Sequence, residues 1–340
     1  MSQPLLLIAA LAAFSASYVL TILVQRKAAL LGLVKAPNER SSHVVPTARG
    51  GGLGLAVVGV AGCLAFALYS APVLGLVGVL GAVIAFIGFA DDLVEVSVAT
   101  RLAVQVAVVA ALVAGIELSL GGLSDTLTLS RIVVLSVAVL GGVWWVNSYN
   151  FMDGIDGIAA SQAILILVGA SILWLYSDRN AASEAMFGAI VIIAAGTGGF
   201  LLRNWPPASI FMGDVGSTFL GLMILAALQI TVTLGVVSLV AWAILLSVFA
   251  TDSMITLLRR TFRGERPWRA HRRHAYQQLS RRWGHRNVTL LYSALTGLWA
   301  FPLAVAAMAM PSGNLWLLPA AYLPLGILFI WAGAGARDEF

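Results

Sequence analysis

The chain has 340 residues, of which 60% are hydrophobic and only 10% are charged. A soluble globular domain carries about 25% charged residues. The composition and a mean hydropathy of +0.95 therefore exclude a soluble enzyme and indicate many membrane-crossing segments. The net charge of +5 would suggest a nucleic-acid partner for a soluble protein. In a membrane protein basic residues gather in cytoplasmic loops instead, and we expect no nucleic-acid partner.

Apolar segments follow one another along the whole chain. A helix needs roughly 20 apolar residues to cross about 30 Å of hydrocarbon, and eleven segments approach that length. We predict an all-α polytopic membrane protein with about 11 transmembrane helices, in which residues 1–340 form a single integral membrane domain. The predicted spans are 4–24, 52–70, 72–90, 102–118, 132–149, 158–176, 185–203, 216–234, 237–258, 289–309 and 314–334.

Basic residues are distributed unevenly over the connecting segments. With the N-terminus outside, the inside segments hold 18 Lys and Arg residues, and the outside segments hold only Arg131 and Arg179. This difference predicts a periplasmic N-terminus and a cytoplasmic C-terminus. Arg26 and Lys27 follow the first span rather than precede it, which indicates a transmembrane helix and not a cleaved signal peptide. The predicted cytoplasmic loops are 25–51, 91–101, 150–157, 203–215 and 259–288.

Two adjacent carboxylates, Asp91 and Asp92, end the third span on the predicted cytoplasmic side. Ionisable residues at membrane depth are costly and need a partner or a purpose. Neighbouring residues on a helix point about 100° apart, so one carboxylate is free to meet a cation while the other meets a substrate proton. An Asp-Asp pair taken alone is more often a solvated helix end, and it gains weight only in combination with other motifs.

The segment 147–157 carries four amide or carboxylate side chains, one at every third position. Two glycines within it allow the backbone to leave the helix and to approach a ligand closely. A short polar turn between two spans would need no such series, and the segment holds no basic residue to neutralise it. We therefore predict a functional segment. Its candidate residues are Asn147, Asn150, Asp153 and Asp156.

Asp214 lies between Gly213 and Gly216, next to an apolar span. A carboxylate with open surroundings suits Mg²⁺, which prefers oxygen ligands and keeps water and substrate phosphates in its shell. The alternative is a helix-start aspartate that complements the helix dipole. Nearby Asn204 and Phe211 offer a hydrogen bond and a stacking face for a nucleotide base, although either residue taken singly is more often structural.

The basic loops add candidate phosphate ligands. His271 and His274 are three residues apart among arginines. They can share a helix face and suit an anionic phosphate better than a metal; a zinc site is the second interpretation. Asp252 upstream is either functional or a structural ion pair with an arginine. In the first loop, His43 and Arg49 precede three glycines, which permit close backbone approach to an anion.

In this order, Asp91-Asp92, the segment 147–157, residues 211–217 and the histidine loop resemble the polyprenyl-phosphate N-acetylhexosamine-1-phosphate transferases, of the glycosyltransferase family 4 type. The histidine loop and residues 38–43 are most similar to the O-antigen-initiating branch. The resemblance implies transfer of N-acetylhexosamine-1-phosphate from a UDP-sugar to undecaprenyl phosphate, with release of UMP. It places this phosphotransferase (EC 2.7.8 type) in a bacterial inner membrane, with its site on the cytoplasmic face, in the synthesis of lipopolysaccharide O-antigen or a related cell-wall glycan.

The resemblance also implies a cofactor and roles for the candidate residues. Mg²⁺, with Mn²⁺ as the alternative, would be held on the diphosphate by Asp214 together with Asp153. One residue of the Asp91-Asp92 pair would deprotonate or orient the lipid phosphate, and the histidines would contact phosphate or sugar. The catalytic candidates are Asp91, Asp92, Asp214, His271 and His274. The substrate-binding candidates are Asn147, Asn150, Asp153, Asp156, Asn204, Phe211, Arg49 and His43.

Three alternative functions were compared with this one. A peptidoglycan-type phospho-sugar-pentapeptide transferase is the nearest. A CDP-alcohol phosphotransferase is excluded, because Asp153-Gly-Ile-Asp156-Gly matches only the first half of its motif. Ser161 stands at the arginine position, and the next aspartate is Asp178, on the opposite side of the membrane. A transporter would carry charged residues near the middle of several spans and paired halves, whereas here the acidic motif residues lie at span ends. The sequence leaves the sugar and the formation of a homodimer open.

Overall fold

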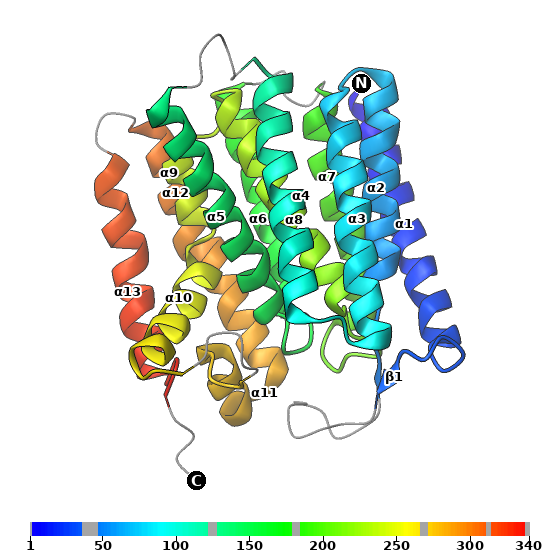
Figure 1. Ribbon diagram of the computed structural model, residues 1–340, viewed down its shortest axis with the longest axis vertical. Helices are drawn as coiled ribbons and strands as arrows, with labels where there is room; N and C mark the ends of the chain where they lie inside the picture. Colours follow the sequence, from blue (N-terminus) through cyan, green and yellow to red (C-terminus); the bar gives the residue numbers. More distant parts are fainter. Residues whose placement is uncertain are drawn as a thin grey trace.

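The protein is described by a computed structural model over residues 2–35, 47–121, 128–178, 184–265, 271–310 and 314–336. Within these ranges the chain is a bundle of long helices (Figure 1), which confirms the all-α polytopic prediction. The first eight helices are α1 (Gln3–Lys27), α2 (Gly52–Tyr69), α3 (Val73–Val94), α4 (Val98–Ser119), α5 (Leu129–Phe151), α6 (Ile158–Ser177), α7 (Ala185–Asn204) and α8 (Asp214–Thr233). The remaining helices are α9 (Leu239–Leu245), α10 (Ser247–Phe262), α11 (Ala275–Ala294), α12 (Phe301–Ala309) and α13 (Leu317–Trp331).

The number of spans agrees with the prediction. In the described part of the chain, 10 helices are long and apolar enough to cross a membrane, or 11 if the bent pair α9 and α10 counts as one span. Figure 1 shows that α1 begins at the end of the bundle opposite to α11, whereas α13 ends on the same side as α11. An odd number of crossings gives this arrangement.

The ninth span is broken rather than straight, which corrects the prediction of one continuous helix over 237–258. The axes of α9 and α10 differ by 71° at Leu246. The helix α10 buries a series of polar side chains, namely Thr251, Asp252, Ser253 and Thr256. Polar groups are costly to leave in hydrocarbon, and the bend turns this helix towards partners at the end of the bundle.

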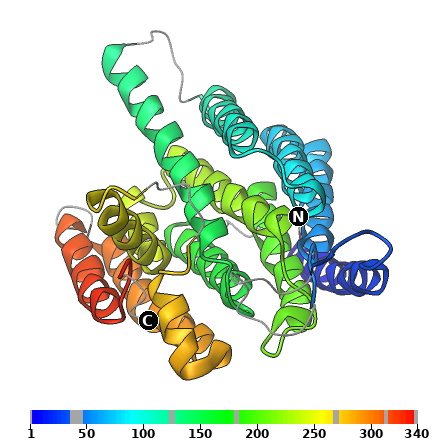
Figure 2. The same cartoon turned by 60° about the horizontal axis from the view of Figure 1, so that its bottom comes forward.

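The loops that carry the sequence motifs gather at one end of the bundle, which we call the polar end. It comprises the short hairpin of β1 (Val34–Lys35) and β2 (Thr47–Ala48), the turns 95–97, 152–157 and 205–213, and residues 271–274 before α11. Figure 2, turned towards this end, shows α10 to α13 on one side of the molecule and α1 and α2 on the other.

Backbone hydrogen bonds join two of these loops. The amide of Phe211 donates to the carbonyl of Ala48 (2.9 Å), and the amide of Gly51 donates to the carbonyl of Phe211 (2.9 Å). The first loop and the 205–213 turn therefore form one unit beside the start of α8. The two-stranded hairpin itself was not predicted, because each strand is only two residues long.

The central helix of the bundle is α8, of whose apolar stretch 83% is buried. Its first turn is surrounded closely by α2 and α3. A Cβ atom at Gly52 or Gly88 would overlap the backbone of Gly216 or Asp214, respectively. Only glycine allows these helices to approach so closely, and this packing brings the ends of α2 and α3 to the N-terminus of α8, where Asp214 lies.

Candidate active site

Three polar-end segments supply the five motif aspartates. Asp91 and Asp92 lie in the last turn of α3, Asp153 and Asp156 in the turn after α5, and Asp214 at the first position of α8. The structure thus brings these carboxylates, from three separate parts of the sequence, to one end of the bundle. The five carboxylates fall into two groups. Asp91, Asp153 and Asp214 face one another, whereas Asp92 and Asp156 brace the surrounding loops.

Asp91 and Asp214 are joined by an arginine that the sequence analysis counted only as a loop charge. The Nη1 atom of Arg101 lies 2.6 Å from Oδ2 of Asp91 and 3.1 Å from Oδ2 of Asp214. A tight turn brings Arg101 there, because Oδ1 of Asp91 accepts from the amide of Val96 (2.7 Å) and α4 then runs back along α3. The signal for Arg101 was its position in the first turn of the helix that follows the Asp-Asp pair.

Asp92 caps a helix in this structure, and its contact with the lipid phosphate stays a prediction. The side chain is 5% exposed. Its two oxygens accept from the backbone amides of Asp214 (3.2 Å) and Val215 (3.3 Å). These amides are among the unpaired donors of a helix N-terminus, and a carboxylate there also complements the helix dipole. Asp92 therefore fixes the first turn of α8 and, through it, the position of Asp214.

Glycine is required directly before Asp214. Gly213 has φ = 75°, a left-handed conformation that favours glycine. A Cβ atom at this position would also overlap Oδ2 of Asp92. The glycine before Asp214 therefore leaves room for Asp92 to cap α8, the helix on which Asp214 lies.

Asp153 faces the same group of charges. Loss of hydration raises the pKa of its carboxyl well above the usual value, and the negative charges of Asp214 and Asp92 raise it further. The positive charge of Arg49 partly offsets this effect. The charges of Asp214 and Arg49 therefore both act on Asp153.

Asp156 braces the loops, and its position beside the nucleotide stays a prediction. It is 5% exposed. Its Oδ2 accepts from the amide of Ala208 (3.0 Å) and lies 3.3 Å from Nδ1 of His285. Its backbone carbonyl accepts from the hydroxyl of Thr289 (2.8 Å). Asp156 thus ties the turn after α5 to the 205–213 turn and to α11.

Asn204 also joins two loops. It is 3% exposed. Its Oδ1 accepts from the amide of Gly157 (3.0 Å), and its Nδ2 donates to the carbonyl of Ile210 (2.9 Å). Both ends of the side-chain amide bind buried backbone groups, and the role of Asn204 as a nucleotide ligand stays a prediction.

The other amides of the 147–157 segment differ from each other. Asn147 donates to Oε1 of Gln105 (2.6 Å) and to the carbonyl of Val143 (2.8 Å), so it joins α5 to α4. Asn150 lies half-buried in the last turn of α5. Phe211 is half-buried in the neighbouring turn. The latter two remain candidate substrate ligands, whereas His43 lies outside the described residues.

The two predicted histidines stack on each other. The rings of His271 and His274 have centroids 5.0 Å apart at 29°, and His274 also stacks on Tyr276 at 5.7 Å. Burial lowers the pKa of His271 to about 3, with a further lowering from His274, Arg260 and Arg273. His271 is therefore neutral at physiological pH and is a hydrogen-bonding group rather than a cation for phosphate.

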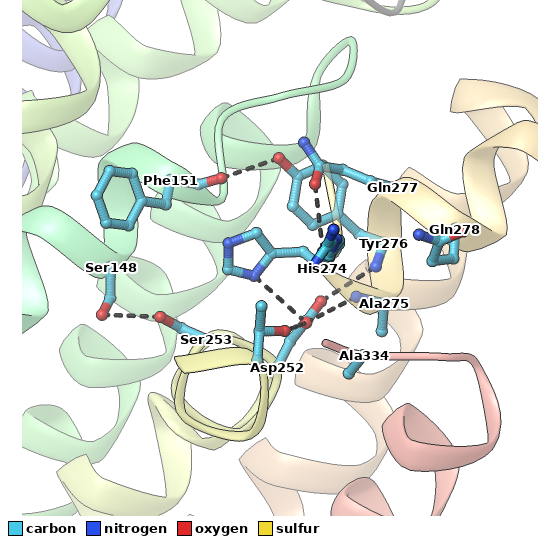
Figure 3. A network of polar contacts seen from close by, with 12 residues as sticks. Ser148, Phe151, Asp252, Ser253, His274, Ala275, Tyr276, Gln277, Gln278 and Ala334 are labelled. Carbon is cyan, nitrogen blue, oxygen red and sulfur yellow. Dashed lines mark hydrogen bonds and ion pairs between the residues drawn. The ribbon is translucent and has the colours of Figure 1, made fainter. Parts of the chain in front are cut away.

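Asp252 is fully buried and its partners are not arginines. It accepts from the backbone amides of Ala275 and Tyr276 and from the hydroxyl of Tyr292, and it lies 3.5 Å from Nδ1 of His274 (Figure 3). The structural alternative in the sequence analysis, an ion pair with an arginine, is therefore wrong for the described residues.

The donor set of the site suits a hard cation. Carboxylates that raise one another's pKa favour a cation between them, and Asp153 and Asp214 supply the oxygen ligands that Mg²⁺ prefers. In the described ranges no three His, Cys, Asp or Glu side chains form a closed metal cage. Mg²⁺ commonly uses one or two carboxylates and completes its shell with water and substrate phosphates, so this donor set fits an ion that is held jointly with a phosphate ligand.

Carboxylates and arginines gather at one end of an apolar helical bundle, and this arrangement defines a polytopic membrane protein with a charged site at that end. Residues 74–234 match the family described as glycosyl transferase family 4. The chain is 27% identical to the probable undecaprenyl-phosphate N-acetylglucosaminyl 1-phosphate transferase of Bacillus subtilis, over 88% of this chain and 83% of the relative. It is 30% identical to the decaprenyl-phosphate N-acetylglucosaminephosphotransferase of Mycobacterium tuberculosis, over 92% and 85% of the two chains.

A third relative has a different printed activity. The phospho-N-acetylmuramoyl-pentapeptide-transferase of Mycolicibacterium vanbaalenii is 30% identical, over 66% of this chain and 71% of the relative. The chain therefore belongs to the polyprenyl-phosphate N-acetylhexosamine-1-phosphate transferase family, as its motifs indicated.

Proposed function

We propose that this protein transfers N-acetylglucosamine-1-phosphate from UDP-N-acetylglucosamine to a polyprenyl phosphate and releases UMP. The observation that carries the proposal is the arrangement of Asp91, Arg101 and Asp214, with Asp153 facing the same charges, at the end of an apolar bundle. One substrate of such a reaction has a lipid tail and the other is water-soluble, so a site at the membrane surface serves both. The choice of sugar follows the names of the two relatives matched over most of their length.

The chain's own residues suit the proposed reaction. A phosphate oxygen of the lipid forms a bond to the β-phosphorus of the donor, the bond from that phosphorus to the bridging oxygen breaks, and UMP leaves. Asp214 and Asp153 would hold Mg²⁺, which neutralises diphosphate charge when bound. Phosphoryl transfer depends mainly on positioning and charge stabilisation, and Arg101 and Arg49 supply positive charge beside these carboxylates.

Asp91 is the better candidate of the Asp-Asp pair for the lipid phosphate. Asp92 is occupied by the amides of α8, whereas Asp91 is 15% exposed and is paired with the movable side chain of Arg101. We propose that Arg101 shifts from Asp91 towards the substrate phosphates when both substrates are bound, which leaves Asp91 to orient the attacking phosphate.

An apolar groove offers a place for the polyprenyl tail. It is lined by residues of α5, α10 and α13, and its volume is about 490 Å³. Trp144 in this groove lies one helical turn before Asn147, and Thr251 lies next to Asp252. The groove therefore lies beside two helices, α5 and α10, that also carry candidate site residues. Its lining includes Trp144, Thr251, Met254, Tyr322 and Gly326.

The proposed location and product follow from the same reaction. The 18 to 2 distribution of basic residues supports a cytoplasmic site in a bacterial inner membrane. We propose that the product initiates a cell-envelope glycan, of which O-antigen is the form that the histidine-loop motif suggests. A peptidoglycan-type activity is the second candidate because a relative with that name aligns over 66% of the chain.

A panel of donors tests the proposal. Purified protein with undecaprenyl phosphate and Mg²⁺ is given UDP-N-acetylglucosamine, other UDP-N-acetylhexosamines including 6-deoxy sugars, or UDP-N-acetylmuramoyl-pentapeptide, and UMP release is measured. We expect the highest kcat/KM with UDP-N-acetylglucosamine. A preference for the pentapeptide donor would replace the proposed substrate with the peptidoglycan one, and transport of a solute without UMP formation would contradict the enzyme assignment.

A further inference from the structure

Asp252 is a buried carboxylate that the proposed chemistry does not use directly. It lies in α10, the second helix of the bent span, and is 0% exposed. Burying a carboxylate costs several kcal/mol unless donors surround it. Its retention in a membrane helix therefore calls for a structural or functional reason.

Both oxygens of Asp252 are directed to the N-terminus of α11. Oδ1 accepts from the amide of Ala275 (2.8 Å), and Oδ2 accepts from the amide of Tyr276 (3.1 Å) and from the hydroxyl of Tyr292 (2.6 Å). These amides are helix-end donors without an intrahelical partner. Asp252 on α10 thus fixes the start of α11, as Asp92 on α3 fixes the start of α8.

The start of α11 carries the histidine loop. His274 immediately precedes this helix, its Nδ1 lies 3.5 Å from Oδ1 of Asp252, and its ring is stacked between His271 and Tyr276. His274 is only 3% exposed, so its ring is enclosed between the carboxylate of Asp252 and the two stacked rings. The contacts that fix the start of α11 therefore also set the position of this ring.

The same helix start also holds the aspartate turn. The hydroxyl of Tyr276 donates to the carbonyl of Phe151 (2.9 Å), two residues before Asp153 (Figure 3). Gly154 packs so closely on this hydroxyl that a Cβ atom would overlap it. A displacement of α11 would therefore be transmitted to the turn that contains Asp153.

We infer that Asp252 is a positioning residue for the proposed transfer. Through the N-terminus of α11, Asp252 holds His274 and the turn that contains Asp153 in place. The inference rests on the proposed function only for its kinetic consequence. A cap that serves stability alone would hold α11 without any effect on the turn that contains Asp153. A stabilising role and a positioning role therefore predict different exchange rates in that turn.

The first test is hydrogen–deuterium exchange of the full-length protein in lipid nanodiscs. Asp252→Asn is compared with Glu117→Gln, the same carboxylate-to-amide change near the other end of the bundle, where Glu117 binds Thr233 and Arg131. We expect exchange to be about fivefold faster or more in peptides 272–278 and 150–157 of Asp252→Asn alone, because both depend on the helix start. Unchanged exchange in peptide 150–157 would overturn the inference.

The second test is a double-mutant cycle on kcat/KM for UMP release. Asp252→Asn should lower kcat/KM by about tenfold or more. The loss that it causes in the His274→Gln background should be smaller than in the wild type, because part of the effect of Asp252 passes through His274. Equal losses in the two backgrounds would overturn the inference. If the wild-type protein releases no UMP, the proposed function fails, while the exchange measurement still decides the role of Asp252.

A milder variant serves if Asp252→Asn does not fold. Tyr292→Phe removes one donor to Asp252 and keeps the aromatic ring. We expect a smaller change with the same pattern: faster exchange in both peptides and a loss of kcat/KM that is reduced in the His274→Gln background. Additive losses together with unchanged exchange would count against the inference.

Discussion

At the scale of single residues, the site separates side chains that face the ligand space from those that hold the loops. Asp92 and Asp252 share one device: each is a buried carboxylate that accepts two backbone amides at the start of another helix. The sequence motif could not distinguish them from Asp91 or Asp214, because all four are aspartates near the ends of apolar spans. The distinction depends on which helix end packs beside each carboxylate, and that is a tertiary property.

Two asparagines give a direct contrast between the two groups. Asn204→Ala leaves the buried Gly157 amide and Ile210 carbonyl without partners, which costs about 1–3 kcal/mol for each group. We expect a lower thermal midpoint and an unchanged KM for the nucleotide sugar. Asn150→Ala should instead raise this KM with little effect on the midpoint. Thermal unfolding and initial rates measure both, and the opposite pattern would support Asn204 as the nucleotide ligand.

His271 predicts a specific pH dependence of stability. Its pKa is about 3 in the folded protein against 6.5 in the unfolded chain. Above 6.5 neither state binds the proton. As the pH falls below 6.5 the unfolded chain takes up a proton that the folded protein excludes, so stability is lost between about 6.5 and about 3.

The variant His271→Gln cannot take up this proton. We therefore expect its thermal midpoint to fall less than that of the wild type between about pH 7 and about pH 5. Midpoints measured at several pH values in one detergent test the expectation. Parallel curves for the two proteins would show that His271 is not held neutral by burial.

At the scale of helices, the spans were predictable because apolar length is a local signal. All eleven predicted segments correspond to helices or to the bent pair. The 71° bend was not predictable, since it depends on polar contacts of α10 with partners far away in sequence, such as the hydrogen bond from Ser253 to Ser148. The Asp214 cap likewise depends on glycines that let three helices approach.

The groove beside α10 gives a prediction at this scale. Gly326 lines it, and a Cβ atom there would make only ordinary contact with Ile255, at 3.8 Å. Gly326→Leu should therefore fold normally, fill the groove and raise KM for the polyprenyl phosphate by about tenfold with an unchanged KM for the nucleotide sugar. Ala82→Leu, in the separate groove between α2 and α3, is the matched control. A rise in lipid KM for Ala82→Leu alone would move the lipid to that groove.

At the scale of the whole molecule, the bundle collects at one end the loops that the charge distribution assigned to one side. The helix α1 begins at one end of the bundle and α13 ends at the other, which fits the odd number of spans. The reaction class was accessible from sequence because its motifs lie in short loops next to spans. Arg101, Asp252 as a cap and the braces formed by Asp156 and Asn204 were not, because these roles arise only when distant loops meet.

The central claim is that the carboxylates at the polar end form a site for metal-assisted phosphoryl transfer. It is tested most directly by UMP release from UDP-N-acetylglucosamine and undecaprenyl phosphate, measured for the wild type and Asp214→Asn with Mg²⁺ and after chelation. Glu117→Gln, near the opposite end, is the control. We predict turnover for the wild type and the control with Mg²⁺ only, and a loss of about 10³-fold or more for Asp214→Asn. Full activity of Asp214→Asn, or wild-type turnover without any divalent cation, would contradict the claim.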